Sequence, residues 1–196
     1  MKEIKNKKSI AIQFRLEDGF SPEKITTKRM LSAMSGMYLN NKKLKEMIGK
    51  KDIIVYEFYE LDIPKEPGEL AYGTTILYPG KVDNEYFMTK GHFHSNIDTA
   101  EVYYCIQGHG FLLMENSEGD VELQEMIPGT SVYVPPRYAH RSINISDSEK
   151  FIMFFVFRAD AGHDYKTIET KGFRKLLLEI DGKPQLIDNP KWKDSE

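Results

Sequence analysis

Closely spaced turn signals constrain this chain more than any other feature of its sequence. From position 52 onward, Gly and Pro recur at short intervals, and the stretches between them are rich in β-branched and aromatic residues, which favour strands. Many short strands with helices only at the edges are typical of an all-β sandwich or jelly-roll barrel. We expect strands at 53–61, 70–78, 86–94, 101–107, 111–115, 121–126, 130–134, 140–145, 151–158 and 174–180.

The length of the chain limits the number of domains. Its 196 residues suffice for one domain with a full hydrophobic core and are few for two. We therefore expect a single domain over 1–196, with an N-terminal arm, 1–50, packed on the barrel and a polar C-terminal tail, 188–196. Within the arm we expect a helix over 28–37 and a second short helix capped by Asn40 or Asn41.

Charge and cysteine content exclude several classes of partner. The net charge is −3 and the isoelectric point is near 6.0, so bulk charge gives no reason to expect nucleic acid or an anionic membrane as a partner. The longest unbroken apolar run, 151–157, is too short to cross a bilayer as a helix. The lone Cys105 cannot form an internal disulfide, and no apolar segment follows the N-terminal lysines as it would in a secretory signal. We expect a cytoplasmic protein with no membrane partner.

The histidines are unevenly placed along the chain. His92 and His94 are two residues apart, so on a strand both would project from one face. Glu101 opens the next expected strand and His140 opens a later one. Three imidazoles and one carboxylate suit one first-row divalent ion, such as Fe²⁺, Mn²⁺, Zn²⁺, Ni²⁺ or Co²⁺, and can leave a position open for substrate. The alternative is that each histidine has a separate structural role.

The residues around these candidate ligands form two motifs. The first is Gly91, His92, Phe93, His94, Glu101 and Gly108, and the second is Gly129, Pro135, His140 and Asn144. This arrangement resembles the cupin superfamily, whose fold is a double-stranded β-helix. In that superfamily two histidines, a glutamate and a third histidine bind a metal inside the barrel, and the resemblance implies this role for His92, His94, Glu101 and His140. Arg137 departs from the pattern, since it stands where the second motif usually has glycine.

Four further blocks, 74–80, 89–94, 100–103 and 159–165, resemble the cupin-type, archaeal-type phosphoglucose isomerases. The resemblance covers roughly 35–192, and the wide spacing between His94 and Glu101 is a habit of that family. Its members interconvert glucose 6-phosphate and fructose 6-phosphate with a bound divalent metal and are commonly dimers. The resemblance therefore implies a sugar-phosphate isomerase with one metal ion per subunit, Fe²⁺ being favoured, and a homodimer.

The substrate needs hydrogen-bond donors at its phosphate and an acid–base group at its carbonyl. The resemblance implies Glu101 as the base, whereas hydride movement with Glu101 only as a ligand stays open. Tyr103 would share the strand face of Glu101 and could hold a hydroxyl or relay a proton. Phe157 stands where a family member can carry a tyrosine. The candidates for phosphate binding are Thr75, Thr89, Lys90, Gly91, His163 and Tyr165.

Two other functions remain open at this point. The same ligand set could hold ferrous iron for oxygen chemistry, as in a metal-dependent cupin oxygenase. The chain could also be a non-catalytic cupin that binds a sugar phosphate without turning it over. Whether mannose 6-phosphate is also accepted stays open as well.

Overall fold

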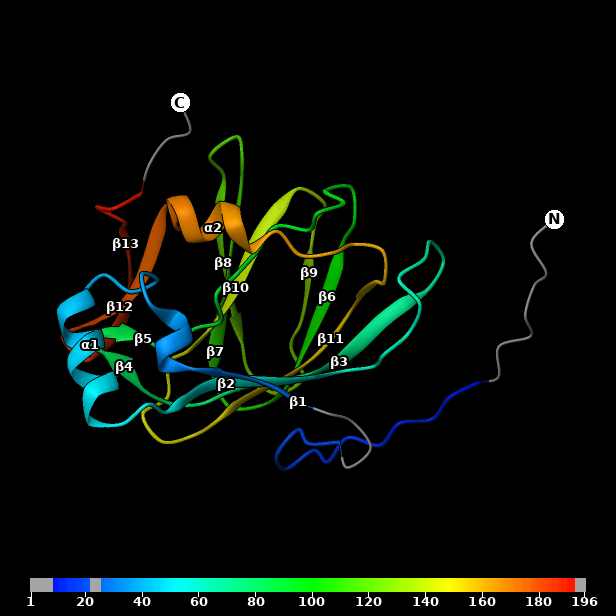
Figure 1. Cartoon of the computed structure of the whole chain (residues 1–196), viewed down its shortest axis with the longest axis horizontal. Coiled ribbons are helices and arrows are strands. Elements are labelled where there is room, and N and C mark those ends of the chain that lie inside the picture. The colour runs from blue at the N-terminus through cyan, green and yellow to red at the C-terminus, as the bar shows by residue number, and fades with distance from the viewer. Residues whose placement is uncertain (1–8, 22–25, 193–196) are drawn as a thin grey trace.

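The computed structural model describes residues 9–21 and 26–192 and is dominated by β-strands (Figure 1). The expected all-β cupin barrel with a few peripheral helices is confirmed. In the part of the chain described, no helix is long and apolar enough to cross a membrane. The helical elements are η1 (Leu31–Met34), α1 (Asn41–Lys50) and α2 (Tyr165–Lys171). The strands are β1 (Thr26–Met30), β2 (Ile54–Glu60), β3 (Leu70–Leu77), β4 (Lys81–Val82), β5 (Glu85–Tyr86), β6 (Glu101–Gln107), β7 (Gly110–Asn116), β8 (Val121–Met126), β9 (Ser131–Val134), β10 (Tyr138–Asn144), β11 (Phe151–Arg158), β12 (Lys175–Ile180) and β13 (Lys183–Asp188).

The strands form three sheets. A six-stranded sheet has the order β1-β2-β3-β11-β6-β9, a three-stranded sheet the order β10-β7-β8, and a four-stranded sheet the order β13-β12-β5-β4. In Figure 1 the first two sheets face each other across the centre of the molecule, while α1 lies at the left edge and α2 at the top. All the neighbouring pairs are antiparallel, as expected for a barrel built from hairpins and longer connections.

Alternation of buried and open positions along β6 shows how the sheet presents the site. Glu101, Tyr103 and Cys105 are buried, whereas Tyr104 is 45% exposed. Successive side chains of a strand point to opposite faces, so the expected common face of Glu101 and Tyr103 is confirmed. That face looks into the barrel.

The described residues of the N-terminal segment differ from the expected pair of helices. The helix predicted over 28–37 is wrong, because β1 pairs with the edge strand β2 and only η1 is helical. Pairing with the edge of the sheet satisfies the backbone hydrogen bonds of this segment that a helix would otherwise satisfy. Tertiary contacts thus outweigh the local helical pattern. The predicted cap is confirmed, since the Asn40 side chain accepts a hydrogen bond from the Lys43 N–H at 3.0 Å and α1 follows.

The strand expected over 86–94 is also wrong as a continuous element. Regular pairing ends with β5, and beyond it the chain makes isolated bridges from Met88 to Ile143 and from His92 to His140. Gly91 lies between these bridges with φ +76°, a left-handed conformation that interrupts a strand. Strands β4 and β13 were not predicted. The expected tail overlaps β13, whose Asp188 pairs with Lys175, and 193–196 lie outside the described residues.

Candidate metal centre and substrate cavity

The four predicted metal ligands meet at one place inside the barrel. His92, His94, Glu101 and His140 each present a ligand atom, and these atoms lie within 4.8 Å of one another. Glu101 and His140 are almost fully buried, and the Nε2 atom of His92 is also shut off from solvent. The structure therefore confirms that residues distant in sequence converge, and the cluster could hold one metal ion.

Backbone pairing positions two of these histidines against each other. The His140 N–H donates to the His92 carbonyl at 3.1 Å, and the His92 N–H donates to the His140 carbonyl at 3.3 Å. Gly91 makes the turn that brings the chain to β10. The position requires glycine because a side chain there would collide with neighbouring residues. The glycine of the first motif is thus a steric requirement for placing His92.

Hydrogen bonds also orient the rings. Nδ1 of His94 lies 3.1 Å from the Thr99 carbonyl and can donate its proton there, which leaves Nε2 as a lone pair facing the Glu101 carboxylate at 3.1 Å. Nε2 of His140 lies 3.0 Å from the same carboxylate oxygen. A histidine that binds a metal through one ring nitrogen usually donates a hydrogen bond from the other to a carbonyl, which fixes the orientation of the ring.

The donor atoms in this cluster fit a cation. Nε2 of His92 and Nε2 of His140 are buried and make no hydrogen bond to any described residue. Buried polar atoms without a partner are costly, and several lone pairs directed at one carboxylate need a positive charge between them. A divalent ion satisfies all four groups, and imidazole with carboxylate is a donor set for first-row metals.

The charge states of the cluster agree with this interpretation. Burial by itself would raise the pKa of Glu101, but the adjacent His140 and His94 rings outweigh it, so the pKa is lowered and the carboxylate is ionised. Burial and the neighbouring His140 lower the pKa of His92 well below its ordinary value. A neutral imidazole and an ionised carboxylate are the forms that bind a metal.

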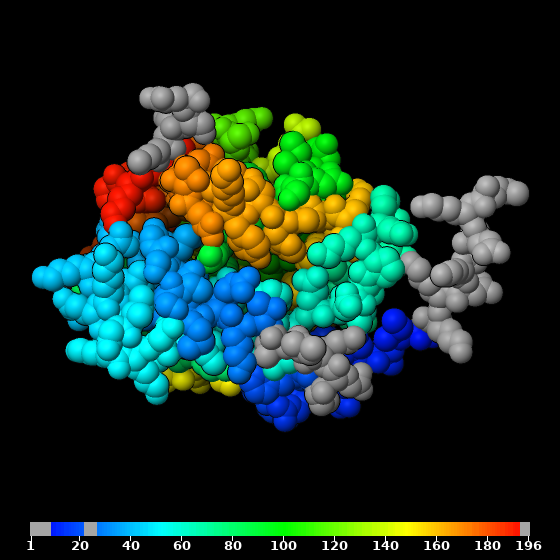
Figure 2. Space-filling model, in the orientation of Figure 1, coloured from blue at the N-terminus to red at the C-terminus, as the bar shows by residue number. Residues whose placement is uncertain are grey.

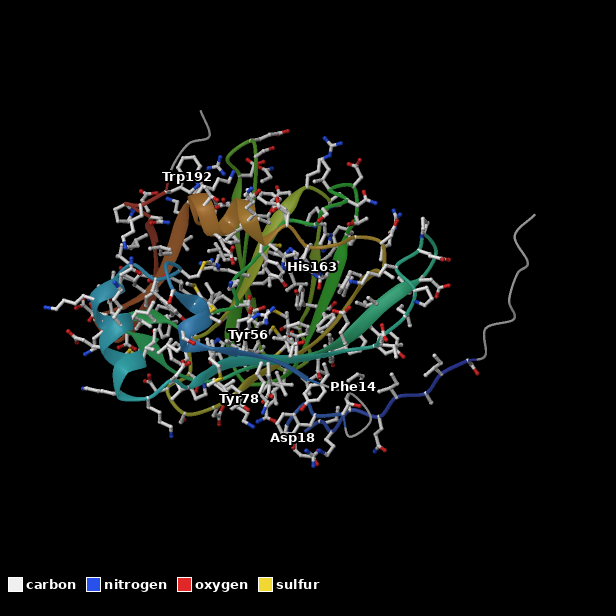
Figure 3. All side chains as sticks on the ribbon, in the orientation of Figure 1. Phe14, Asp18, Tyr56, Tyr78, His163 and Trp192 are labelled. Atoms are coloured by element: carbon white, nitrogen blue, oxygen red, sulfur yellow. The ribbon has the colours of Figure 1, made fainter. Side chains whose placement is uncertain are left out.

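A cavity of about 270 Å³ opens beside the cluster and includes most of the predicted site residues. Glu101, Tyr103, His92 and His140 line it from the barrel interior. The predicted phosphate-binding residues Thr75, Thr89, Gly91, His163 and Tyr165 line it as well. Figure 3 places His163 and Tyr56, another lining residue, well inside the outline of the molecule.

Neutral donors surround this cavity. The His163 ring lies 4.4 Å from the His92 ring and 5.7 Å from the Tyr165 ring, measured between centroids. Burial lowers the pKa of His163 to about 4 and raises the pKa of Tyr165 to about 12. The Thr89 hydroxyl accepts from the Ser142 N–H at 3.0 Å, so its own proton is available for a ligand.

One predicted phosphate-binding residue is not brought to the cavity. The Lys90 side chain is absent from the described lining, and its ammonium pairs with Glu169 at 2.5 Å.

Sequence reasoning missed two cations that line the cavity, Arg29 of β1 and Lys65 of the loop after β2. No local pattern marks either residue, and both come from segments whose position depends on tertiary packing. Phe157 lines the cavity too, with its ring 5.3 Å from that of His163. The phenolic hydroxyls in the described lining belong to Tyr56, Tyr103 and Tyr165.

Comparison with known proteins agrees with the geometry. A family model described as glucose-6-phosphate isomerase matches residues 28–192. The chain is 45% identical over 190 residues to the glucose-6-phosphate isomerase of Thermococcus litoralis, covering 97% of this chain and 100% of that protein. It is 44% identical over 187 residues to the enzyme of the same name from Pyrococcus furiosus, covering 95% and 98%. Among solved structures, an oxalate oxidase in complex with glycolate matches 58% of this chain and 56% of its own, at 15% identity and a TM-score of 0.47.

Proposed function

We propose that Glu101 moves the proton in the isomerisation that this chain catalyses, in the cavity beside the His–Glu cluster. The chain belongs to the glucose-6-phosphate isomerase family and interconverts glucose 6-phosphate and fructose 6-phosphate. The observation that carries the proposal is the combination of groups in one cavity: an ionised, buried carboxylate together with neutral hydroxyl donors and two cations. Family membership disfavours the oxygenase and the binding-only alternatives.

The phosphate of the substrate requires several donors and positive charge. Thr75, Thr89 and Tyr165 offer hydroxyl protons, the backbone at Gly91 approaches without a side chain, and Arg29 or Lys65 supplies charge. In our proposal these groups hold the phosphate and leave the reacting carbons at Glu101. Lys90 takes no direct part, because its ammonium is paired with Glu169.

Isomerisation moves a hydrogen between the two carbons at the carbonyl end. Glu101 removes the proton from the carbon next to the carbonyl and returns it to the former carbonyl carbon, while the hydroxyl proton passes from the oxygen that becomes the new carbonyl to the oxygen of the old one. Burial and the adjacent Glu101 raise the pKa of Tyr103 well above its ordinary value, so Tyr103 stays a neutral donor that can hold a substrate oxygen. A divalent ion held by the cluster would polarise the carbonyl oxygen and stabilise the negative charge that develops on it.

Solvent exchange tests this route against a hydride shift. Conversion of fructose 6-phosphate in D₂O should place deuterium at the carbon that receives the proton, because the proton on Glu101 exchanges with solvent. Glu101→Gln should abolish turnover in a coupled assay while its circular dichroism stays that of the wild type. Tyr103→Phe serves as the matched control, since it removes a donor from the same strand face and leaves the base. Product without deuterium, or near-normal turnover of Glu101→Gln, would contradict Glu101 as the base.

The metal, the oligomer and the location are further parts of the proposal. Fe²⁺ is the ion that we propose for the cluster, to be compared with Mn²⁺, Zn²⁺, Ni²⁺ and Co²⁺ by reconstitution. We propose a homodimer formed through the outer face of the six-stranded sheet, where Tyr104 is 45% and Tyr133 59% exposed. Sedimentation should then give twice the 22.7 kDa chain mass, and a monomer would contradict it. We also propose one domain over 1–196 and a cytosolic location.

A further inference from the structure

A second cavity, of about 400 Å³, lies apart from the metal cluster and shares no lining residue with the first. Its walls are the arm at 36–39, the C-terminal end of α2 with the residues after it, 168–173, and the tail at 189–192. Figure 2 shows these segments gathered on one side of the molecule, with α2 in orange, the tail in red and the arm in blue. Nothing in the isomerase reaction uses this cavity.

Arg141 is the most unusual group in its lining. It follows His140 on β10, so the two side chains point to opposite faces of the strand, one to the metal cluster and the other to this cavity. Arg141 is 2% exposed, and no described carboxylate lies within ion-pair distance of it. A buried guanidinium without an ion pair is costly, so a negative group beside it would be favourable.

The neighbours of Arg141 leave part of it unsatisfied. Nη1 contacts the Met88 sulfur at 3.0 Å, Nη2 donates to the Lys90 carbonyl at 2.6 Å, and the guanidinium carbon lies 4.2 Å from the centre of the Phe173 ring. Nε has no hydrogen-bond partner among the described residues. The largest electrostatic influence of an acid on Arg141 is that of Glu85, and Glu115 has a smaller one, but neither forms an ion pair with Arg141 or lines the cavity.

Two more donors in the lining have no acceptor among the described groups. They are Nε1 of Trp192 and the hydroxyl of Tyr38, a residue that is 1% exposed and whose oxygen has the Met88 N–H as a donor, so that only its proton is without a partner. Burial raises the pKa of Tyr38, so its hydroxyl keeps its proton. An indole nitrogen can only donate. Donors without acceptors therefore accumulate around this one space.

The charged residues of the lining have the same bias. Lys171 and Lys191 add two cations to Arg141, and the one carboxylate, that of Glu169, is paired with Lys90 outside the cavity. The Lys191 ammonium donates to the Leu39 carbonyl and so joins the tail to the arm. The cavity is thus closed on two sides, positively charged and rich in unpaired donors.

We propose that this cavity binds a small polyanionic metabolite, whose phosphate or carboxylate oxygens pair with Arg141 and accept from Tyr38 and Trp192. Oxyanions supply several acceptors and a negative charge, which are the two things that the lining lacks. Because Arg141 follows His140 on β10, an occupant paired with Arg141 would contact the strand that also carries His140.

The chain carries its own reporter for this proposal, because Trp192 is its single tryptophan. Titration of the purified full-length protein with inorganic pyrophosphate, and separately with citrate, should change the tryptophan fluorescence along a saturating curve. The tighter of the two probes identifies the phosphate or the carboxylate class. Arg141→Gln should weaken binding about tenfold or more, as expected for loss of a charged hydrogen-bond donor.

Milder variants keep the test valid should Arg141→Gln fail to fold. Tyr38→Phe removes only a hydroxyl and Lys171→Ala only a rim charge, and each should weaken binding by about two- to tenfold with an unchanged far-ultraviolet spectrum. Thr75→Ala, in the first cavity, is the matched control and should titrate like the wild type.

Three results would overturn the proposal. The first is no saturable change with either anion up to about 10 mM, which corresponds to an affinity too weak for a built site. The second is wild-type affinity in both Tyr38→Phe and Lys171→Ala. The third is loss of the signal in Thr75→Ala, which would place the anion in the substrate cavity.

Discussion

Replacement of Gly91 by alanine tests how the backbone places the metal ligands. Gly91 has φ +76°, and a Cβ there would lie 2.6 Å from a Phe173 ring carbon, 3.0 Å from the Arg141 Cβ and 3.0 Å from the His140 carbonyl oxygen. The left-handed conformation costs a residue with a Cβ about 1–2 kcal/mol. Forcing extra atoms into a packed region adds about 1–3 kcal/mol. The expected loss is therefore about 2–5 kcal/mol in the free energy of unfolding.

The same substitution should affect function, since His92 is the next residue and its backbone is bonded to His140. Relief of the clash has to move one of these two ligands. Gly91→Ala should lose metal and isomerase activity together, measured by elemental analysis and the coupled assay on one sample, besides its lower midpoint in urea.

Gly119→Ala is the matched control for this substitution. Gly119 has φ +104° and no atom within 4 Å of a Cβ built there, so alanine pays the conformational cost alone, about 1–2 kcal/mol. It should retain full metal content, because it lies in the turn between β7 and β8. Equal destabilisation of the two variants, or full metal content in Gly91→Ala, would refute the reasoning.

Three further substitutions have defined outcomes. Burial raises the pKa of Glu85 to about 7, so the wild type loses stability as pH rises from about 4.5 through 7. The free energy of unfolding of Glu85→Gln should therefore gain on that of the wild type by at most about 3 kcal/mol across that window. A pH-independent difference in urea unfolding would contradict this. Arg137 has φ +72°, and its side chain pairs among the described residues with Asp98, both side chains being about two-thirds exposed. Arg137→Gly should therefore raise the thermal midpoint, because it relieves about 1 kcal/mol of backbone strain and loses only an exposed ion pair. A lower midpoint would exclude the strain. Thr75→Ala should raise KM for fructose 6-phosphate whereas Lys90→Ala leaves it unchanged; equal effects of the two in steady-state kinetics would argue against the assigned phosphate site.

The parts of the fold that could be predicted from sequence are those with dense local signals. The strand expected over 101–107 coincides with β6, because alternating burial is bounded there by a turn at Gly108. The convergence of the His–Glu cluster could be predicted for a related reason, since glycines and prolines at the strand ends bring His140 back beside His92. Arg137, which departs from the usual motif, adopts the left-handed φ that a glycine there would favour, so the backbone is kept although the residue differs.

The parts that could not be predicted depend on contacts between distant segments. The segment 28–37 has a helical apolar pattern, yet its first residues pair with β2 as β1, and this pairing brings Arg29 to the substrate cavity. The position of Lys65 depends on how a loop folds over the barrel. The second cavity could not be predicted either, since its walls come from the arm, α2 and the tail, and only their packing places the Arg141 side chain beside it.

Metal titration of the stripped enzyme tests the central claim most directly. Protein treated with a chelator should have no isomerase activity, and activity should return linearly with added Fe²⁺ until it reaches a break at one ion per chain. His140→Ala should show no such break. Full activity in the stripped protein, or a break unchanged in His140→Ala, would contradict the account that His92, His94, Glu101 and His140 hold the ion on which the reaction depends.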